Sequence, residues 1–227
     1  KHGMFMAHNC GYGVGWKKFS DTLLRQGIKL DPDLEKHREM AKHAHSVYRM
    51  MHPNIVAFWD TCQRVIEAMA MGCSGSFAGP NNDLIEYGPM YMPGYDKLVP
   101  SVRMPSGYMI RYPNLRAENT GGRRPEYFYD RVKGNSVQKI KIYGGAFTEN
   151  ITQCLAFQLL IWQACRMAEH GVALAGNIHD SFATVVPESE AKRTLEVMTY
   201  WMSQVPSWLP NFPVECEGAM GTDFRVV

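Results

Sequence analysis

The stretch GVALAGNIHDSFATVV, residues 171–186, decides how the C-terminal part of the chain folds. It consists of two short apolar segments that flank the polar pair His179-Asp180. Two apolar segments joined by two polar residues are typical of a β-hairpin with a tight turn. The sequence therefore predicts a hairpin that presents His179 and Asp180 at its tip.

Asp180 is a candidate metal ligand. A carboxylate that follows a buried strand, and is held at a bend by backbone structure, suits a divalent cation such as Mg²⁺. Asp is also a favoured turn residue, so a purely structural role fits the same position. The residues of the hairpin leave both interpretations open.

The rest of the sequence predicts helices first and strands in the middle. Up to about residue 75, apolar residues recur at helical spacing, with Asp31-Pro32 as a helix start and Gly72 as a helix stop. Residues 75–145 carry Gly, Pro and Asn between short apolar segments, as strands and turns do.

Further along, we expect a long helix that ends at Gly171, a helix over residues 188–203 and a last strand in the tail 212–224. The expected fold class is α+β. We also expect the methionines of the N-terminal helices to fill the core. These are Met40, Met50, Met51, Met69 and Met71.

Composition and charge narrow the possible classes of protein. A chain of 227 residues that is 45% hydrophobic buries a substantial core, which excludes a disordered protein. A net charge of +2 gives no overall attraction to nucleic acid, so a binding face must be a local patch. Basic residues concentrate between residues 103 and 141, among several tyrosines. They are Arg103, Arg111, Arg116, Arg123, Arg124, Arg131, Lys133, Lys139 and Lys141.

The six cysteines are scattered without a C-x-x-C pair, which favours reduced thiols inside a cell. No apolar segment approaches the ~20 residues that a membrane helix needs, and the first residues lack the layout of a signal peptide. We therefore expect a cytoplasmic protein without a membrane partner.

Gly11-Tyr12-Gly13-Val14-Gly15 is glycine-rich, but no strand precedes it and no Gly-Lys-Ser/Thr follows, which argues against a phosphate-binding loop. Together with four later motifs it resembles family A DNA polymerases of the phage type. The five motifs are Gly11-Tyr12-Gly13, Pro105-Ser106-Gly107 with Arg111-Tyr112-Pro113, Tyr143-Gly144-Gly145, Glu149-Asn150 with Gln153, and His179-Asp180. The resemblance spans nearly the whole chain.

This resemblance implies helical fingers over residues 1–76 and the C-terminal half of a polymerase palm over residues 77–227. It implies a DNA-directed DNA polymerase, a nucleotidyltransferase of a phage-infected or bacterial cell. Its substrates are primer–template DNA and deoxynucleoside triphosphates, and its cofactor is a pair of Mg²⁺ ions. By resemblance, Asp180 is catalytic and binds metal, and His179 contacts the primer terminus.

Two metal ions need at least two carboxylates. The family's first palm motif supplies the second Asp, and no part of this sequence resembles that motif. We therefore expect a split polymerase or a part of a longer one, in which an upstream segment or an N-terminal partner chain supplies the thumb and the missing Asp. The chain alone is expected to be inactive.

The resemblance also assigns nucleotide and DNA contacts. Lys1, His8, Tyr12 and Gly13 belong to the nucleotide site, with Tyr12 stacking beside the templating base. Met4 stands where the family has Lys, so the ammonium of Lys1, one helical turn away, is a candidate replacement, and crippled nucleotide binding is the alternative. His8 and Tyr12 each fit a purely structural role as well.

Asn150 and Gln153 are three residues apart on a helix and suit a sequence-independent contact in the DNA minor groove. The same two residues also suit a structural role, in which they only cap and solvate the start of the helix. Arg111, Arg123 and Arg124 are candidate phosphate contacts. Phe157 stands where the phage enzymes usually have Arg, which puts one phosphate contact in doubt.

Two further interpretations compete. Ser181 replaces the second acid of the DNA polymerases, and HDSFAT is similar here to single-subunit RNA polymerases. Alternatively, Met4, Ser181 and Phe157 together favour a non-catalytic DNA-binding or assembly subunit with a degenerate polymerase fold.

Overall fold

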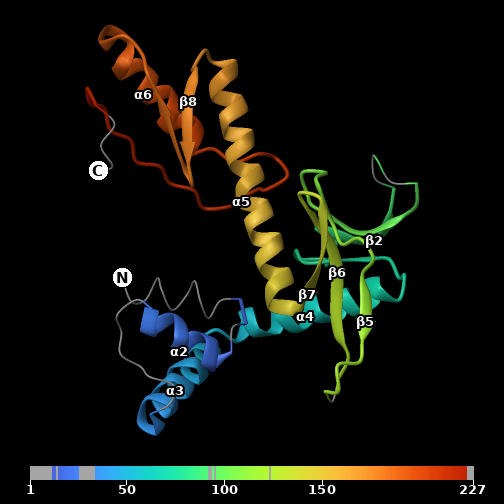
Figure 1. Cartoon of the computed structure of the whole chain (residues 1–227). Helices are drawn as coiled ribbons and strands as arrows, with labels where there is room; N and C mark the ends of the chain where they lie inside the picture. The colour runs from blue at the N-terminus through green and yellow to red at the C-terminus, as the bar shows by residue number, and fades with distance from the viewer. Residues whose placement is uncertain are drawn as a thin grey trace. The chain divides into compact units, whose positions relative to one another are not determined.

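The computed structural model describes residues 12–13, 15–25, 34–91, 94, 96–122 and 124–223. Lys1, His8 and Arg123 lie outside these residues, as do Gly11 and Asp31-Pro32. The chain forms two compact units, Lys1–Thr152 and Gln153–Val227, which are described separately (Figure 1). The expected division into residues 1–76 and 77–227 stays a prediction.

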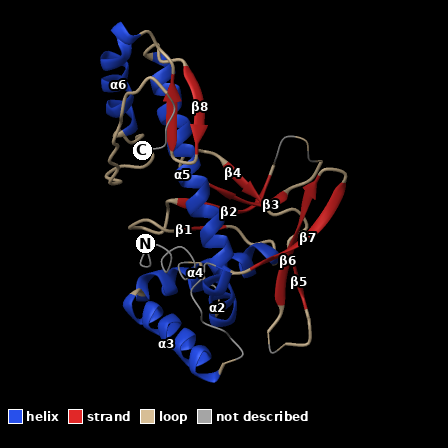
Figure 2. Ribbon diagram, turned by 60° about the vertical axis from the view of Figure 1, so that its left-hand side comes forward, coloured by secondary structure: helices blue, strands red, loops and turns tan. Residues whose placement is uncertain are grey.

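In the part of the first unit that the structure describes, three helices precede the strands, in the region where the sequence predicts helices (Figure 2). They are α2 (Trp16–Arg25), α3 (Glu35–Met51) and α4 (Pro53–Ala70). Gly72 has a φ of 78° and follows the end of α4, where its amide donates to the carbonyl of Met69 at 3.0 Å. A left-handed glycine that satisfies a last helical carbonyl is a common way to end a helix.

The methionines of these helices are mostly on the surface, which corrects the expectation that they fill the core. Met40, Met50, Met51 and Met71 are at least half exposed, and Met69 is buried. The buried face of α4 comprises Trp59, Cys62, Val65, Ile66 and Met69. Helical spacing therefore selects the core, and the other methionines fall on the outer faces.

Between residues 75 and 142, the described residues form seven strands in two antiparallel sheets. The first sheet has the order β1 (Gly75–Phe77), β2 (Ile85–Met90), β3 (Val99–Arg103), β4 (Met109–Arg111). The second has the order β5 (Arg116–Glu118), β6 (Glu126–Lys133), β7 (Ser136–Ile142). Pro105-Ser106-Gly107 forms the turn between β3 and β4, where Gly107 has a φ of 86° and its amide donates to the Met104 carbonyl at 2.8 Å.

Aromatic rings join the sheets to the helices of this unit. Phe77 of β1 lies 6.3 Å from Phe58 of α4 and 6.2 Å from Phe147, measured between ring centroids. Tyr112 stacks on Phe147 at 5.4 Å and meets Tyr129 edge-on at 5.1 Å. Because Phe147 belongs to helix α5 (Gly144–Glu169), the start of that helix is built into this core.

Helix α5 begins at Gly144, so it includes the two glycines that precede the expected polar start at Glu149. Glycine is a poor helix former, and its use here has a steric cause. A Cβ on Gly144 would overlap the backbone carbonyl of Trp59 in α4, and a Cβ on Gly145 would overlap the carbonyl of Tyr12. Gln63 Oε1 accepts a hydrogen bond from the Gly144 amide at 3.0 Å and caps the helix.

The second unit contains the rest of α5, the hairpin of β8 (Leu174–Ile178) and β9 (Ser181–Thr184), and α6 (Glu188–Met202). Buried Gln163 of α5 donates to the carbonyls of Met202 and Gln204 at 2.8 and 3.1 Å, which satisfies backbone groups at the end of α6. Trp162 and Trp201 pack edge to face at 6.1 Å. The predicted hairpin and helix are confirmed.

Two details of this unit differ from what the sequence predicts. Most of β8 is exposed, although we expect a buried strand before Asp180. The described part of the tail, residues 212–223, forms no strand, although its sequence predicts one. A segment becomes a strand when it pairs with a neighbouring strand, and among the described residues this segment pairs with none.

The mixed α+β class is confirmed, with antiparallel sheets throughout the described residues. Within that part of the chain, no helix combines the length and the apolar character needed to cross a membrane.

Replacing Gly145 by Ala should lower the free energy of unfolding by about 2–4 kcal/mol, because two backbone segments must separate to admit the methyl group. Gly15→Ala is the matched control, since a Cβ there meets nothing within 4 Å, and it should change stability by about 0.5 kcal/mol or less. Urea denaturation followed by circular dichroism measures both. Equal effects of the two substitutions would contradict the packing described here.

Cys62 reports the packing of α4 against α5. Burial raises the pKa of its thiol to about 11, and a hydrogen bond from Thr148 Oγ1 at 3.4 Å offsets part of that rise. At pH 8 the thiolate fraction is therefore roughly a hundredfold below that of an ordinary thiol. In the folded chain, iodoacetamide should modify the exposed Cys73 and Cys165 long before Cys62, as peptide mass spectrometry can follow. Rapid modification of Cys62 would show that this helix pair is open.

Candidate functional site

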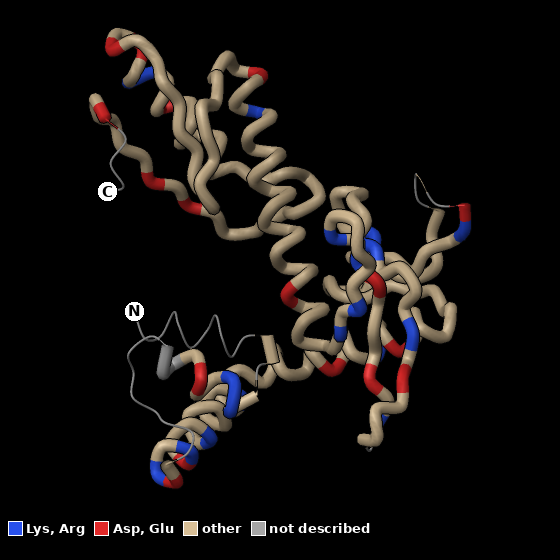
Figure 3. The backbone as a smooth tube through the Cα atoms, in the orientation of Figure 1, with Lys and Arg blue, Asp and Glu red and all other residues tan. Residues whose placement is uncertain are grey.

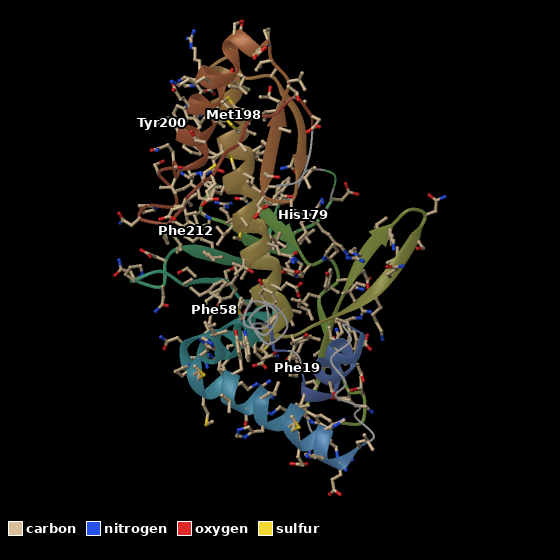
Figure 4. The ribbon with its side chains drawn as sticks, turned by 90° about the vertical axis from the view of Figure 1, so that its left-hand side faces the viewer. Phe19, Phe58, His179, Met198, Tyr200 and Phe212 are labelled. Atoms are coloured by element: carbon tan, nitrogen blue, oxygen red, sulfur yellow. The ribbon has the colours of Figure 1, made fainter. Side chains whose placement is uncertain are left out.

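The hairpin of the second unit holds His179 and Asp180 as the two residues of its turn. Figure 4 labels His179. Ile178 pairs with Ser181 across the turn, and Ser181 Oγ donates to the Ile178 carbonyl at 2.8 Å. Asn177 Nδ2 donates to the Ser181 carbonyl at 3.2 Å. The turn is thus braced from both strands, and both of its side chains are exposed.

His179 has a φ of 55°, in the left-handed region that side-chain-bearing residues seldom occupy. Glycine, Asn or Asp is the usual residue at such a turn position. Strained backbone of this kind clusters at functional sites, where a particular side chain is needed. His, like Asn and Asp, occupies this region more often than most residues, so the conformation of His179 fits both a functional side chain and an ordinary turn residue.

Asp180 offers one exposed carboxylate on a rigid turn, a donor that suits Mg²⁺. Within the described residues there is no group of three His, Cys, Asp or Glu side chains that could hold a metal ion. Mg²⁺ in enzymes is often held by one or two carboxylates, with water and substrate phosphates completing its shell. Asp180 therefore fits as one ligand of a metal site, and further ligands must come from elsewhere.

The first unit brings the other motifs together around the start of α5. The Tyr12-Gly13 turn lies against Gly145, and a Cβ on Gly13 would be 3.5 Å from the Gly145 Cα atom. Gly13 has a φ of 72°, so glycine is required there for its backbone as well. Half-buried Tyr12 accepts a long hydrogen bond from Thr152 Oγ1 at 3.4 Å.

Asn150 is positioned by a residue from another motif. Its Nδ2 donates to the Tyr112 hydroxyl at 3.1 Å, and the Tyr112 side chain is buried in the aromatic core. Exposed Gln153 lies one turn further along α5. The sequence predicts Asn150 as a site residue but not the positioning roles of Tyr112, Gln63 and Thr152, because pairings between residues far apart in the sequence leave no local pattern.

The two described arginines among the predicted DNA contacts are both exposed, at separate places. Arg111 ends β4, and Arg124 precedes β6, where it lines a recess with Gln63, Glu67 and Tyr127. The structure does not bring them to one point.

Acidic residues lie among the basic ones along the second sheet (Figure 3), and ion pairs neutralise several of the basic side chains. Arg116 pairs with Asp130 at 2.9 Å, Lys139 pairs with Glu118 at 2.8 Å, and Lys141 pairs with Glu126. Hydrogen bonds from Asn114 and Arg116 lower the pKa of Asp130, and hydrogen bonding by Lys139 and Lys141 lowers the pKa values of Glu118 and Glu126 respectively. These pairs stabilise the second sheet.

Comparison with known proteins relates part of the chain to a DNA polymerase. Over 132 residues, 57% of this chain, the sequence is 25% identical to the DNA polymerase of Bacillus phage SP02. The match spans 20% of that polymerase. No family model and no solved structure matches the chain. The similarity supports a DNA-polymerase-like function in general terms.

His179→Gly should keep the hairpin, because glycine adopts the left-handed turn without strain. His179→Val should destabilise it by about 1–2 kcal/mol, because a β-branched residue is strained at this φ. Hydrogen–deuterium exchange of the β8 and β9 amides measures the difference, with faster exchange expected only in the valine variant. Equal protection in both variants would show that the turn is not held in this conformation.

Proposed function

We propose that the chain forms the fingers, residues 1–76, and the C-terminal half of the palm, residues 77–227, of a template-directed DNA polymerase. The observation that carries the proposal is the contact of the Tyr12-Gly13 turn with Gly145 at the start of α5. It joins two motifs that are far apart in the sequence. The same stretch of α5 carries Asn150, held by Tyr112, so residues from four of the five motifs meet in the first unit.

The polar side chains on this part of α5, half-buried Asn150 and exposed Gln153, suit nucleic acid. The Tyr12 ring offers a stacking surface that every base can use, and Asn150 and Gln153 can both donate and accept hydrogen bonds in a minor groove. Arg111 and Arg124 are the proposed phosphate contacts. Gly13 admits close backbone approach, and Lys1, His8 and Arg123 stay proposals outside the described residues.

Asp180 is the proposed metal-binding and catalytic carboxylate of the palm. A pair of Mg²⁺ ions supplies activation of the primer hydroxyl and neutralisation of the triphosphate. The braced turn fixes the position of the Asp180 carboxylate and presents the His179 ring beside it, where the ring can contact the primer end. The second carboxylate is proposed to come from an upstream segment or an N-terminal partner chain.

A non-catalytic DNA-binding or assembly subunit is the second candidate. The Ser181 hydroxyl donates a hydrogen bond to the Ile178 carbonyl, so this side chain stabilises the turn. Phe157 is 59% exposed on α5 at the place where the phage polymerases carry Arg. Both features are compatible with a fold that keeps its shape and has lost part of its chemistry.

Primer extension separates the two candidates. With the N-terminal partner chain, primer–template, Mg²⁺ and nucleotides, the native chain should extend the primer, and Asp180→Ala should reduce the rate at least a thousandfold, because a metal ligand is lost. Glu188→Gln, which removes another exposed carboxylate of the same unit, should leave the rate unchanged.

Extension that survives Asp180→Ala would exclude Asp180 as a metal ligand. DNA binding without extension, under conditions where the partner chain is bound, would establish the non-catalytic candidate.

A further inference from the structure

The hairpin of β6 and β7 extends beyond the third strand of its sheet. Strand β5 pairs only with residues 126–128 of β6, whereas β7 stays paired with β6 as far as Lys133 and Ser136. Every residue from 131 to 139 is exposed, and this segment is called the ribbon below. Figure 4 shows the hairpin, in yellow-green, reaching away from the rest of the first unit.

The ribbon has a defined conformation although nothing covers it. Its strands are joined by Gly134-Asn135, and Gly134 has a φ of 58°, as the first central residue of a type II′ hairpin turn requires. Ser136 Oγ donates to the Lys133 carbonyl at 3.0 Å. At the base of the hairpin Phe128 and Ile142 are buried, so the two strands start from the core of the unit.

One face of the ribbon is basic. Opposite residues of paired strands share a face, so Arg131 lies beside Gln138 and Lys133 beside Ser136 on the same side. No Asp or Glu occurs between residues 131 and 143.

These two cations differ from the lysines nearer the base of the hairpin. Lys139 and Lys141 pair with Glu118 and Glu126, whereas among the described residues no acidic side chain forms an ion pair with Arg131 or Lys133. Their charges therefore attract an anion without first breaking an ion pair.

The opposite face of the ribbon tip is apolar. Val132 and Val137 lie directly opposite each other, and their exposed fractions are 72% and 67%. Side chains this exposed gain little free energy from burial in the folded chain. Their apolar surface is available to a ligand.

The dimensions of the ribbon match one groove of duplex DNA. Three residues of a strand span about 10 Å, and a strand pair with its side chains is about 10 Å thick. The major groove of B-DNA is about 12 Å wide and about 8.5 Å deep and admits a two-stranded ribbon, whereas the minor groove is only about 6 Å wide.

We infer that the ribbon inserts its tip into the major groove of duplex DNA. Arg131 and Lys133 contact phosphates on one side, and Val132 with Val137 faces the apolar edges of the bases on the other, where thymine presents a methyl group. The inference rests on the proposed function in taking DNA as the partner. It adds a duplex contact that is separate from the start of α5 and from Asp180.

The salt dependence of binding tests the phosphate contacts. Fluorescence anisotropy with a blunt duplex of about two helical turns measures the affinity of the full chain at several salt concentrations. Because each phosphate contact contributes about 0.9 to the slope of log K against log salt, Arg131→Ala/Lys133→Ala should reduce the magnitude of the slope by about 1.8. Its affinity at low salt should fall at least fivefold.

Lys192→Ala/Arg193→Ala is the matched control, since it removes the same charge from exposed positions of α6 and should leave the slope unchanged. Equal slopes for the native chain and the ribbon variant overturn the inference, as does the same loss of slope in both variants. Absence of duplex binding by the native chain overturns it as well.

Blocking one groove at a time identifies the groove. The difference in affinity between the native chain and the ribbon variant should persist when netropsin fills the minor groove. It should disappear on a duplex whose cytosines carry glucosylated hydroxymethyl groups, which project into the major groove. The opposite pattern, or an equal difference on single-stranded DNA of the same length, contradicts major-groove insertion.

Val132→Thr/Val137→Thr tests the apolar face, because threonine has nearly the same shape and favours strands. Duplex affinity should fall about two- to fivefold with an unchanged salt slope, since an apolar contact releases no counterions. Val185→Thr, at a position 86% exposed in the second unit, should have no effect. Unchanged affinity of the double variant, shown by circular dichroism to be folded, contradicts insertion of the tip.

The ribbon and the proposed polymerase function fail separately, because these measurements use no nucleotide and no primer end. Primer extension that depends on Asp180, with an unchanged salt slope in the ribbon variant, would remove the ribbon contact and keep the proposed function. A reduced slope in the ribbon variant without any primer extension would do the reverse.

Discussion

The first unit depends on two places where backbone touches backbone at the start of α5. Gly144 lies against the Trp59 carbonyl of α4, and Gly145 lies against the carbonyl of Tyr12. No side chain larger than hydrogen fits at either place, so the chain accepts two poor helix formers in the first turn of its longest described helix. This contact fixes the Tyr12-Gly13 turn against the helix that carries Asn150.

Local patterns predicted the elements of the fold well. The hairpin around His179-Asp180, the helix end at Gly72 and the helix after Pro187 all follow from features within a few residues. The start of α5 at Gly144 does not follow from local features, because tertiary contacts and the Gln63 cap outweigh the low helix propensity of glycine there. The tail was wrongly predicted as a strand for a related reason, since strand formation depends on a partner edge.

The candidate site likewise divides into features that the sequence predicts and features that only the structure shows. The resemblance selected Tyr12, Gly13, Asn150 and Asp180 as functional residues, and the structure supplies what holds each of them in place. A buried tyrosine positions Asn150 and has no local sequence signature, whereas the turn that positions Asp180 follows from the local hairpin pattern. The sequence shows where basic residues concentrate. Only the structure shows that acidic neighbours form ion pairs with several of them.

The central claim is that the Tyr12-Gly13 turn and the start of α5 form the template end of a polymerase site. Photo-cross-linking tests it most directly, with 5-iodouracil at the templating position of a primer–template and peptide mass spectrometry of the adduct. The account predicts that the adduct maps to Tyr12 and that Tyr12→Ala removes it. An adduct elsewhere in the chain, with the Tyr12 peptide unmodified while DNA is bound, would contradict the account.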